Sequence, residues 1–453
     1  MGFDYPDGFK NIVIMGGSYG GLRAARVLAE KLADRHDYRI IVIDRNSHMN
    51  HLYVLPRYSI LPNHEPKAFI PYTRIFRHGE HRHMIIQATI RSMTRNSVTV
   101  SYPLPSSPGD LSGPSAAALD EGGVQVIPFE FAIYALGASL PQPINVWQCI
   151  EPTVSTDSDS TDHGPKTPEG NFDGSKFPSI SWLKAAQARV QKSESVIVVG
   201  GGALGIQIAS DIAAVHPTKR VTLIHSRKQL LPIYPLELHE QVMEFLSKLG
   251  VSVVLDSRLS WESMQQDIRD EQNQRILTTV SGEEYRADTV FICTGAKPNV
   301  AILSQGLGED CINPENGLVR VARTLQVDWP QVNAGQEGVE HEENAEKPPF
   351  SHIFAIGDSA DAFGAIKAGH TAYFQGDIAA LNIAALITKG ETAALEKYTP
   401  GPPMIKVSVG LKNHVTQSQT SIYAGDDGKE DLGAGLMWKM LGHEIQNEAD
   451  YDL

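Results

Sequence analysis

Glycines gather twice in this sequence at places where backbone atoms could bind a phosphate. The first group is Gly16-Gly17-Ser18-Tyr19-Gly20-Gly21 and the second is Gly200-Gly201-Gly202-Ala203-Leu204-Gly205. Each group follows a short apolar run and precedes a segment with helical spacing. A glycine turn in this setting brings backbone N–H groups close to a pyrophosphate, whose charge the helix start favours. Each group therefore predicts a dinucleotide-binding turn, and a turn that is glycine-rich for purely structural reasons is the alternative.

The end of the next strand differs between the two copies. In the first copy this strand ends in Asp44, followed by Arg45, and an acid there can bind ribose hydroxyls. In the second copy the strand ends in His225-Ser226-Arg227-Lys228. An acid would repel a 2′-phosphate, whereas polar and basic groups such as Ser226 and Arg227 attract it. The second copy therefore favours NADPH over NADH, unless its basic residues are only a solvated corner.

Three further predicted strands end in glycine. One ends in Gly357-Asp358, which places a carboxylate at the start of the following helix. A carboxylate there can accept a hydrogen bond from a polyol such as the ribityl chain of a flavin. The other two strands end at Gly137 and Gly295, each well downstream of one glycine turn. This pairing suggests that each nucleotide domain ends with the same element, a strand followed by glycine.

The order strand, glycine turn, helix and strand is that of a βαβ unit in a parallel sheet. The predicted fold class is α/β, with two Rossmann-like dinucleotide-binding domains and a small C-terminal α+β domain. We expect an FAD-binding domain over 1–150 and 298–397, an NAD(P)H-binding domain over 175–297 and the C-terminal domain over 398–453. Segments 104–123, 154–174 and 334–349 are predicted to be insertions or linkers.

The composition excludes several classes of protein. Lys and Arg total 39 against 53 Asp and Glu, a net charge of −14, so no basic excess is present to bind nucleic acid. No apolar run reaches the ~18 residues that a membrane-spanning helix needs, and peripheral contact with a membrane is left open. No targeting segment is legible, so a cytoplasmic location is expected. The sequence does not predict the oligomeric state.

Cysteine and histidine patterns exclude other chemistry. The three cysteines, Cys149, Cys293 and Cys311, have no close partner in sequence, which excludes a disulfide framework and a CxxC redox or zinc motif. Cys293 lies within a predicted strand and is expected to be an inert buried thiol. His78, His81 and His83 are expected to form a polar loop, and no metal site is predicted.

Together these motifs resemble the two-dinucleotide-domain flavoproteins of the pyridine nucleotide oxidoreductase superfamily, which have a glutathione-reductase-like fold. Within it, the sequence is most similar to the apoptosis-inducing-factor-like branch that includes the ferroptosis-suppressor quinone reductases. The segments that carry the resemblance are 16–21, 200–205, 294–299, 354–361 and 367–382.

The resemblance implies FAD on the first domain and NADPH or NADH on the second. Hydride would pass to the flavin, and electrons would then reach a quinone-like acceptor. By position, residues 16–21 would hold the FAD pyrophosphate, Asp44 the adenosine ribose and Asp358 the ribityl chain. Other acceptors stay open, namely dioxygen, a redox protein or a biosynthetic small molecule. A redox-sensing flavoprotein is also an alternative.

The resemblance also implies roles for three further residues. Arg57 would be another FAD contact, and Lys367 would lie near the isoalloxazine or the substrate channel. A lysine solvated at a helix start is the alternative for Lys367. Relatives carry glutamate near the flavin edge where this chain has Gln207, which can still form hydrogen bonds. The middle residue of the first turn is Ser18 in place of glycine, and its hydroxyl can donate to a phosphate.

Overall fold

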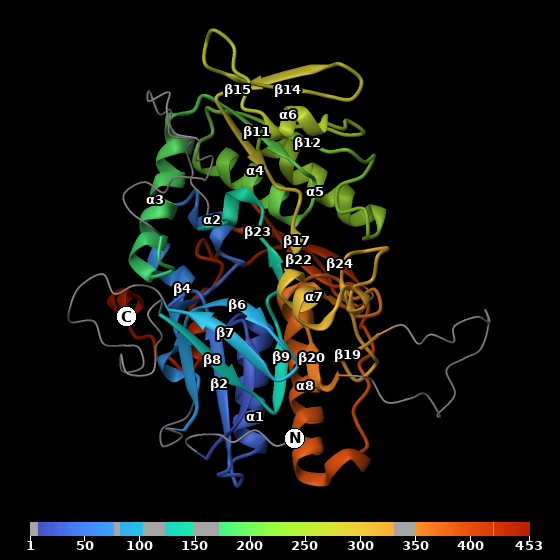
Figure 1. The fold of residues 1–453 in the computed structure, drawn as a ribbon. Helices are drawn as coiled ribbons and strands as arrows, with labels where there is room; N and C mark the ends of the chain where they lie inside the picture. The colour runs from blue at the N-terminus through green and yellow to red at the C-terminus, as the bar shows by residue number, and fades with distance from the viewer. Residues whose placement is uncertain (1–7, 77–81, 103–122, 148–171, 330–349, 420) are drawn as a thin grey trace, which may run out of the picture. The chain divides into compact units, whose positions relative to one another are not determined.

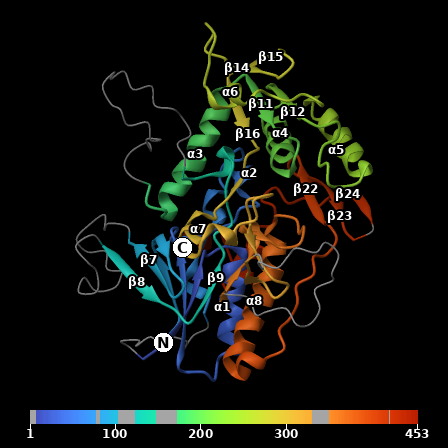
Figure 2. The same cartoon turned by 45° about the vertical axis from the view of Figure 1, so that its right-hand side comes forward.

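The computed structural model describes residues 8–76, 82–102, 123–147, 172–329, 350–419 and 421–453. These residues form two compact units, each drawn from three stretches of the chain (Figure 1 and Figure 2). The first unit comprises Met1–Met49, Pro71–Ser139 and Lys297–Gly401. The second comprises Asn50–Ile70, Leu140–Ala296 and Pro402–Leu453. Each unit contains a parallel sheet of the Rossmann type, so the predicted α/β fold class is confirmed.

A six-stranded sheet in the order β19-β20-β9-β1-β2-β5 lies at the centre of the first unit. Its strands are β19 (Gln326–Val327), β20 (Phe350–Ala355), β9 (Phe131–Tyr134), β1 (Lys10–Met15), β2 (Tyr38–Asp44) and β5 (Met84–Gln87). All pair in parallel except β19, the antiparallel edge. The stretch from Ile12 to Met15 in β1 is fully buried, because a parallel strand covered on both faces needs an unbroken apolar run.

Two long helices of the first unit, α1 (Tyr19–Lys31) and α8 (Gly369–Lys389), pack against each other (Figure 1 and Figure 2). Their close approach depends on a small residue, because a Cβ added at Gly376 would lie 2.5 Å from the carbonyl oxygen of Gly20. Arg23 of α1 and Asp377 of α8 form an ion pair at 2.5 Å. Helix α8 therefore holds the start of α1, where the first glycine turn lies.

Smaller elements complete the first unit. An antiparallel three-stranded sheet contains β6 (Thr89–Met93), β7 (Ser97–Ser101) and β8 (Val124–Pro128). The others are β10 (Ala138–Ser139), β17 (Lys297–Pro298), α7 (Ala301–Leu307), β18 (Val319–Arg320) and β21 (Ala360–Asp361). Short strands β3 (His48–Asn50) and β4 (Phe69–Pro71) lie where the chain passes between units.

The second unit is built on a four-stranded parallel sheet in the order β13-β12-β11-β16. Its strands are β13 (Ser252–Val254), β12 (Arg220–Ile224), β11 (Ser195–Val199) and β16 (Thr289–Ile292). Its helices include α2 (Leu55–Tyr58), α3 (Lys176–Lys192), α4 (Ala203–Val215), α5 (Leu236–Lys248) and α6 (Trp261–Gln265). A hairpin of β14 (Arg275–Thr278) and β15 (Glu284–Ala287) extends from it.

The C-terminal residues share the core of the second unit. Strands β22 (Ile405–Val409), β23 (Asn413–Gln417) and β24 (Ile422–Asp426) form an antiparallel sheet, followed by α9 (Gly435–Met440). Val407, Val409 and Val415 of this sheet are buried together with Ile212 of α4 and Leu246 of α5. The C-terminal strands were expected to form a separate domain over 398–453. In the structure one apolar face of their sheet packs against α4 and α5 within the second compact unit, and the predicted domain boundaries stay a prediction.

Candidate dinucleotide-binding sites

The first glycine turn joins β1 to α1 in a shape that only glycine can adopt. Gly16 has φ of +111°, and a Cβ added to it would lie 2.4 Å from the carbonyl oxygen of Ala135. A Cβ added at Gly21 would lie 1.9 Å from the carbonyl oxygen of Gly16. These contacts bring the first turn of α1 directly against the end of β1. The predicted strand, turn and helix are therefore all present in the structure.

Asp44 ties the end of β2 to the first glycine turn. Its Oδ2 accepts the N–H of Gly17 at 2.6 Å, and its Oδ1 accepts the N–H and Nδ2 of Asn46 at 2.8 and 2.9 Å. Burial raises the pKa of Asp44, and its hydrogen bonds with Asn46 and Gly17 oppose that effect. The structure thus places the predicted acid beside the turn, where it can reach the ribose of a nucleotide bound there.

Tyr72 also contacts this turn, and the sequence carried no signal for it. Its hydroxyl donates to the carbonyl of Gly17 at 2.9 Å, opposite the N–H that Asp44 holds. The N–H and the carbonyl of Gly17 are thereby both held by side chains. Tyr72 lies in a short segment with no glycine or acid motif, so only the folded structure brings it to the turn.

Replacing Tyr72 by phenylalanine is expected to weaken FAD binding by about 1 kcal/mol, because the Gly17 carbonyl loses its donor. The measurement is the dissociation constant of FAD from the deflavinated protein, by fluorescence titration. Tyr102, whose hydroxyl bonds Gln125 away from the turn, is the matched control. An unchanged FAD affinity in Y72F would contradict this role.

The start of α1 is suited to a phosphate group. Ser18 is the N-cap residue, its backbone is extended, and its hydroxyl makes no cap hydrogen bond. The first turn of α1 carries no acidic side chain. A helix start with an uncapped hydroxyl and no negative charge favours an anion. The residues present therefore fit the pyrophosphate of FAD. A Cβ added at Gly20 would lie 2.8 Å from the carbonyl oxygen of Ala372, so this glycine lets α1 approach α8.

The second turn repeats the geometry of the first within the second unit. Gly200 has φ of +114°, and a Cβ added at Gly205 would lie 1.9 Å from the Gly200 carbonyl oxygen. Gly202 is the N-cap of α4, and a Cβ added there would meet no atom within 4 Å. This open space at a helix start fits a second pyrophosphate. The N–H of Gly201 donates to Nδ1 of His225 at 3.0 Å.

The other predicted residues of the second turn lie around it. Leu204 is half-buried against the core, and Ser226 is half-buried at the end of β12. Arg227 is exposed. Gly295 follows β16 with φ of +88°, and in the first unit Gly137 follows β9 with φ of +59°. Both β9 and β16 pair in parallel with the strand before the glycine turn, so the matched pair of closing strands is present.

The Gly357-Asp358 motif follows β20 in the first unit. Gly357 has φ of +77°, and its N–H donates to Oε1 of Gln375 at 2.7 Å. Asp358 is half-buried, and desolvation raises its pKa against the opposing charge of Lys367. The Nζ of Lys367 donates to the carbonyl of Ala360 at 2.6 Å, and desolvation lowers the pKa of this lysine. The structure brings Asp358 and Lys367 into the same electrostatic environment.

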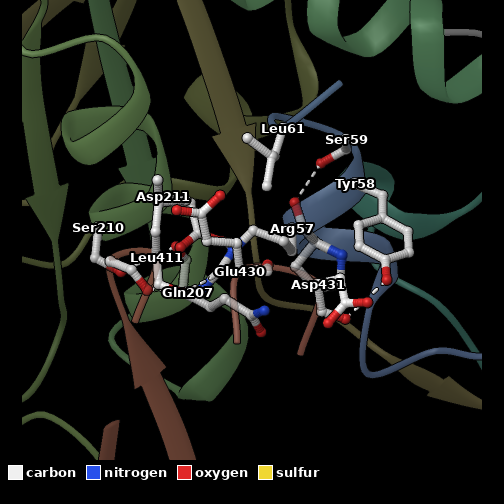
Figure 3. Close-up of polar contacts among 12 residues, drawn as sticks. Arg57, Tyr58, Ser59, Leu61, Gln207, Ser210, Asp211, Leu411, Glu430 and Asp431 are labelled. Carbon is white, nitrogen blue, oxygen red and sulfur yellow. Dashed lines mark hydrogen bonds and ion pairs between the residues drawn. The ribbon is translucent and has the colours of Figure 1, made fainter. Parts of the chain in front are cut away.

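Arg57 and Gln207 lie in the second unit, and Figure 3 shows both. The Arg57 side chain is fully buried, and its Nε pairs with Oδ2 of Asp211 at 2.6 Å. Its Nη1 donates to the carbonyls of Leu411 at 3.0 Å and Glu430 at 2.8 Å, and its Nη2 donates to that of Gly410 at 2.7 Å. The predicted contact of Arg57 with FAD stays a prediction, but all three nitrogens already bind groups of the second unit. Gln207 is half-buried on α4, and its Nε2 is buried without a hydrogen-bond partner among the residues that the structure describes.

The described cysteines are unpaired thiols. Burial raises the pKa of Cys293, and desolvation raises that of Cys311 to about 11, so neither is a ready thiolate. Cys149, His78 and His81 lie outside the described residues. His83 is buried, and its Nδ1 accepts the N–H of Ile40 at 3.1 Å, which is a structural contact.

Two features, a metal-binding cluster and a membrane-spanning helix, are absent from the described part of the chain. No group of three or more His, Cys, Asp or Glu residues there is arranged to hold a metal ion. Within the same residues, no helix has the length and apolar character needed to cross a membrane.

Comparison with known proteins identifies relatives along the whole chain. The pyridine nucleotide-disulphide oxidoreductase family model matches residues 10–376. Fe-regulated protein 8 of Mycosarcoma maydis is 37% identical over 441 residues, covering 96% of this chain and 95% of the relative. Human ferroptosis suppressor protein 1 is 24% identical over 447 residues, covering 96% of both chains.

Solved structures share the fold at low sequence identity. A sulfide:quinone oxidoreductase from Aquifex aeolicus has a TM-score of 0.63 at 14% identity, covering 95% of this chain and 90% of that one. A water-forming NADH oxidase from Lactobacillus brevis has a TM-score of 0.55 at 15% identity, covering 90% and 74%. The chain therefore belongs to the pyridine nucleotide-disulphide oxidoreductase family, and as an NAD(P)H-dependent flavin oxidoreductase it has FAD and NAD(P)H as its cofactors.

Proposed function

We propose that this protein transfers electrons from NAD(P)H to a quinone-type acceptor. The observation that carries the proposal is the presence of two equivalent dinucleotide turns in a chain without a cysteine pair beside the first of them. The two turns supply a site for FAD and a site for NAD(P)H. Disulfide reduction in such a flavoprotein needs two neighbouring cysteines, and this sequence has three cysteines far apart. The similarity to ferroptosis suppressor proteins favours a quinone among the remaining acceptors.

Each residue group has a binding or positioning task in this proposal. Backbone N–H groups of 16–21 hold the FAD pyrophosphate, while Asp44 binds the adenosine ribose. Asp358 accepts a hydrogen bond from the ribityl chain, and Lys367 keeps a positive charge beside it. Residues 200–205 hold the pyrophosphate of NAD(P)H. When bound, FAD supplies the redox chemistry by taking up a hydride and passing its electrons on.

An anaerobic stopped-flow experiment tests the acceptor. The purified, FAD-loaded protein is mixed with NADPH or NADH and then with a short-chain ubiquinone, while flavin absorbance is followed near ~450 nm. We expect rapid bleaching by the nucleotide and rapid recovery of the absorbance with the quinone. Ferricyanide, which takes electrons without protons, is the control that shows whether the reduced protein can release electrons at all.

The same experiment separates the alternatives. Recovery with dioxygen that is faster than recovery with quinone would overturn the proposal in favour of an oxidase. Recovery with ferricyanide alone would point to a redox protein or another small molecule as acceptor. A reduced complex that persists with every acceptor would indicate a redox sensor. A protein that binds no FAD would contradict the cofactor assignment itself.

A further inference from the structure

We infer that Phe363 is a stacking platform for the ring of the quinone-type acceptor and that it determines how tightly this acceptor binds. The inference rests on the proposed function in one premise, namely that the acceptor carries a planar ring. Phe363 lies in the loop between Asp358 and Lys367. Neither glycine turn involves it, and no motif of the sequence includes its side chain.

Phe363 has a backbone conformation that phenylalanine rarely adopts. Its φ is +58°, and that of Gly364 is +77°. The N–H of Ala365 donates to the carbonyl of Ala362 at 3.1 Å, so Phe363 and Gly364 form the centre of a tight turn. Positive φ at both central residues is the pattern of a type I′ turn, in which Asn, Asp or Gly is usual at the first of them. A bulky side chain at this position strains the backbone.

Burial of the Phe363 ring only partly offsets this strain. Six other non-glycine residues among those that the structure describes have positive φ, and three of them are Asn or Asp, which tolerate this region. The remaining three are leucines, of which Leu231 and Leu325 are buried and Leu432 is half-buried. Phe363 is 36% exposed. Strained residues gather at binding and catalytic sites, so a strained and exposed aromatic side chain points to a ligand.

Arg323 holds the Phe363 ring from one side. Its guanidinium carbon lies 3.9 Å from the ring centroid, which is a cation–π contact. Nη1 of Arg323 donates to the carbonyl of Tyr398 at 3.3 Å, and the carbonyl of Arg323 accepts the N–H of Tyr398 at 2.7 Å. Because the guanidinium covers one face of the ring, a planar ligand can stack on the other. A platform fixed in advance loses little conformational entropy when the ligand binds.

The loop that carries Phe363 begins and ends at residues that the proposed function places at the flavin. Lys367 closes the loop, because its Nζ donates to the carbonyl of Ala360 at 2.6 Å. Asp358 precedes Ala360 by two residues, and the charge of Lys367 lowers the pKa of its carboxyl against desolvation. Phe363 is four residues from Lys367, so their Cα atoms are at most about 14 Å apart. It follows from the proposed function that the ring lies near the flavin, where the acceptor must approach.

Steady-state kinetics of the FAD-loaded protein test the inference, with a short-chain ubiquinone as one acceptor and ferricyanide as the other. Phe363→Asn removes the ring and suits the turn. We expect it to raise the KM for ubiquinone by about tenfold. The rate with ferricyanide, which needs no stacking platform, is expected to stay the same. The midpoint of thermal unfolding is expected to rise by about 2 °C or more, because asparagine relieves the backbone strain. Phe363→Trp keeps a ring and is expected to keep the KM of the wild type.

Substitutions at two other residues separate the role of the Phe363 ring from general damage. Arg323→Ala removes the cation behind the ring and is expected to raise the KM for ubiquinone by a smaller factor, with kcat unchanged. Arg323→Lys keeps a cation there and is expected to recover part of the affinity. Phe177→Asn is the matched control, since Phe177 is an aromatic residue that is 79% exposed and has no positive φ. It is expected to change neither the KM nor the unfolding midpoint.

An unchanged KM for ubiquinone in F363N would overturn the inference and leave the proposed function standing. A rise in the KM for NADPH in place of that for ubiquinone would overturn it in favour of the nicotinamide as the stacked ring. A lower unfolding midpoint in F363N would also overturn it, because the ring would then serve packing. If the wild type reduces ferricyanide but no ubiquinone, the proposed function fails and the inference fails with it.

Discussion

Replacing Arg57 by leucine is expected to lower the free energy of unfolding by about 3–5 kcal/mol. Arg57 and Asp211 are both fully buried, so the substitution leaves an unpaired carboxylate in the core of the second unit. It also removes the donors to three backbone carbonyls near the C-terminal sheet (Figure 3). Urea unfolding followed by circular dichroism measures the loss.

Arg35 provides the matched control for this substitution. It pairs with Asp37 at 2.9 Å, but the two side chains are 35% and 45% exposed. Water already solvates both charges, so R35A is expected to lower the free energy of unfolding by no more than about 1 kcal/mol. Equal losses in R57L and R35A would contradict the proposed importance of burial. The double variant R57L/D211L removes both charges and is expected to recover part of the loss.

The loss in the free energy of unfolding caused by R57L is also expected to depend on pH. Burial raises the pKa of Asp211 to about 6 even with Arg57 beside it, and loss of the arginine charge raises it further. A carboxyl whose folded pKa lies above its unfolded value destabilises the fold once it must ionise. Below about pH 6 the Asp211 carboxyl is protonated in both folded proteins, so the difference in stability between R57L and the wild type should be nearly constant there. The difference should grow as the pH rises above about 6, because only the wild type then ionises Asp211 in the folded state. A difference that stays constant from about pH 5 to about pH 8 would exclude Asp211 as its source.

Alanine at Gly21 or Gly205 is expected to remove the nucleotide of one unit and leave the other in place. In each case the new Cβ would lie 1.9 Å from a carbonyl oxygen of the same turn, so the turn and helix must separate. G21A should be isolated with at least about tenfold less FAD. G205A should keep its FAD, while its reduction by NAD(P)H slows by a similar factor.

Flavin content by absorbance and the rate of anaerobic bleaching measure these two effects. Gly401→Ala is the control, because a Cβ there meets no atom within 4 Å and its φ is not positive. It should behave like the wild type in both assays. Loss of FAD from G205A would contradict the assignment of separate cofactors to the two turns.

The parts of the site that could be predicted from the sequence are those formed by neighbours in the chain. Each glycine turn, its flanking strand and helix, and the residue after the next strand all fall within about 30 residues, the length of a βαβ unit. Asp44 was predictable because the register of a parallel sheet brings the ends of adjacent strands together. The Gly357-Asp358 motif was found for the same local reason.

Contacts between distant segments were not predictable. Tyr72 reaches Gly17 from a segment that carries no motif. Gln375 lies in a segment that carries the family resemblance, but nothing in that segment indicates its contact with Gly357. The surroundings of Arg57 depend on carbonyls more than 350 positions away along the chain. Likewise, nothing in the alternation of the C-terminal strands indicates that they cover α4 and α5. These contacts form only when the core folds, and burial in a core does not produce a short motif in the sequence.

The discontinuity of both units has a consequence for synthesis. Arg23 and Asp377 are 354 positions apart, and Arg57 and Gly410 are 353 apart. At about 5–20 residues per second, a ribosome needs roughly 20 to 70 seconds to bridge either gap. Until the later segments are synthesised, the apolar face of α1 lacks its partner α8 and that of α4 lacks its partner β22. Neither unit can close early, so nascent chains should depend on chaperones until the last 50 or so residues emerge.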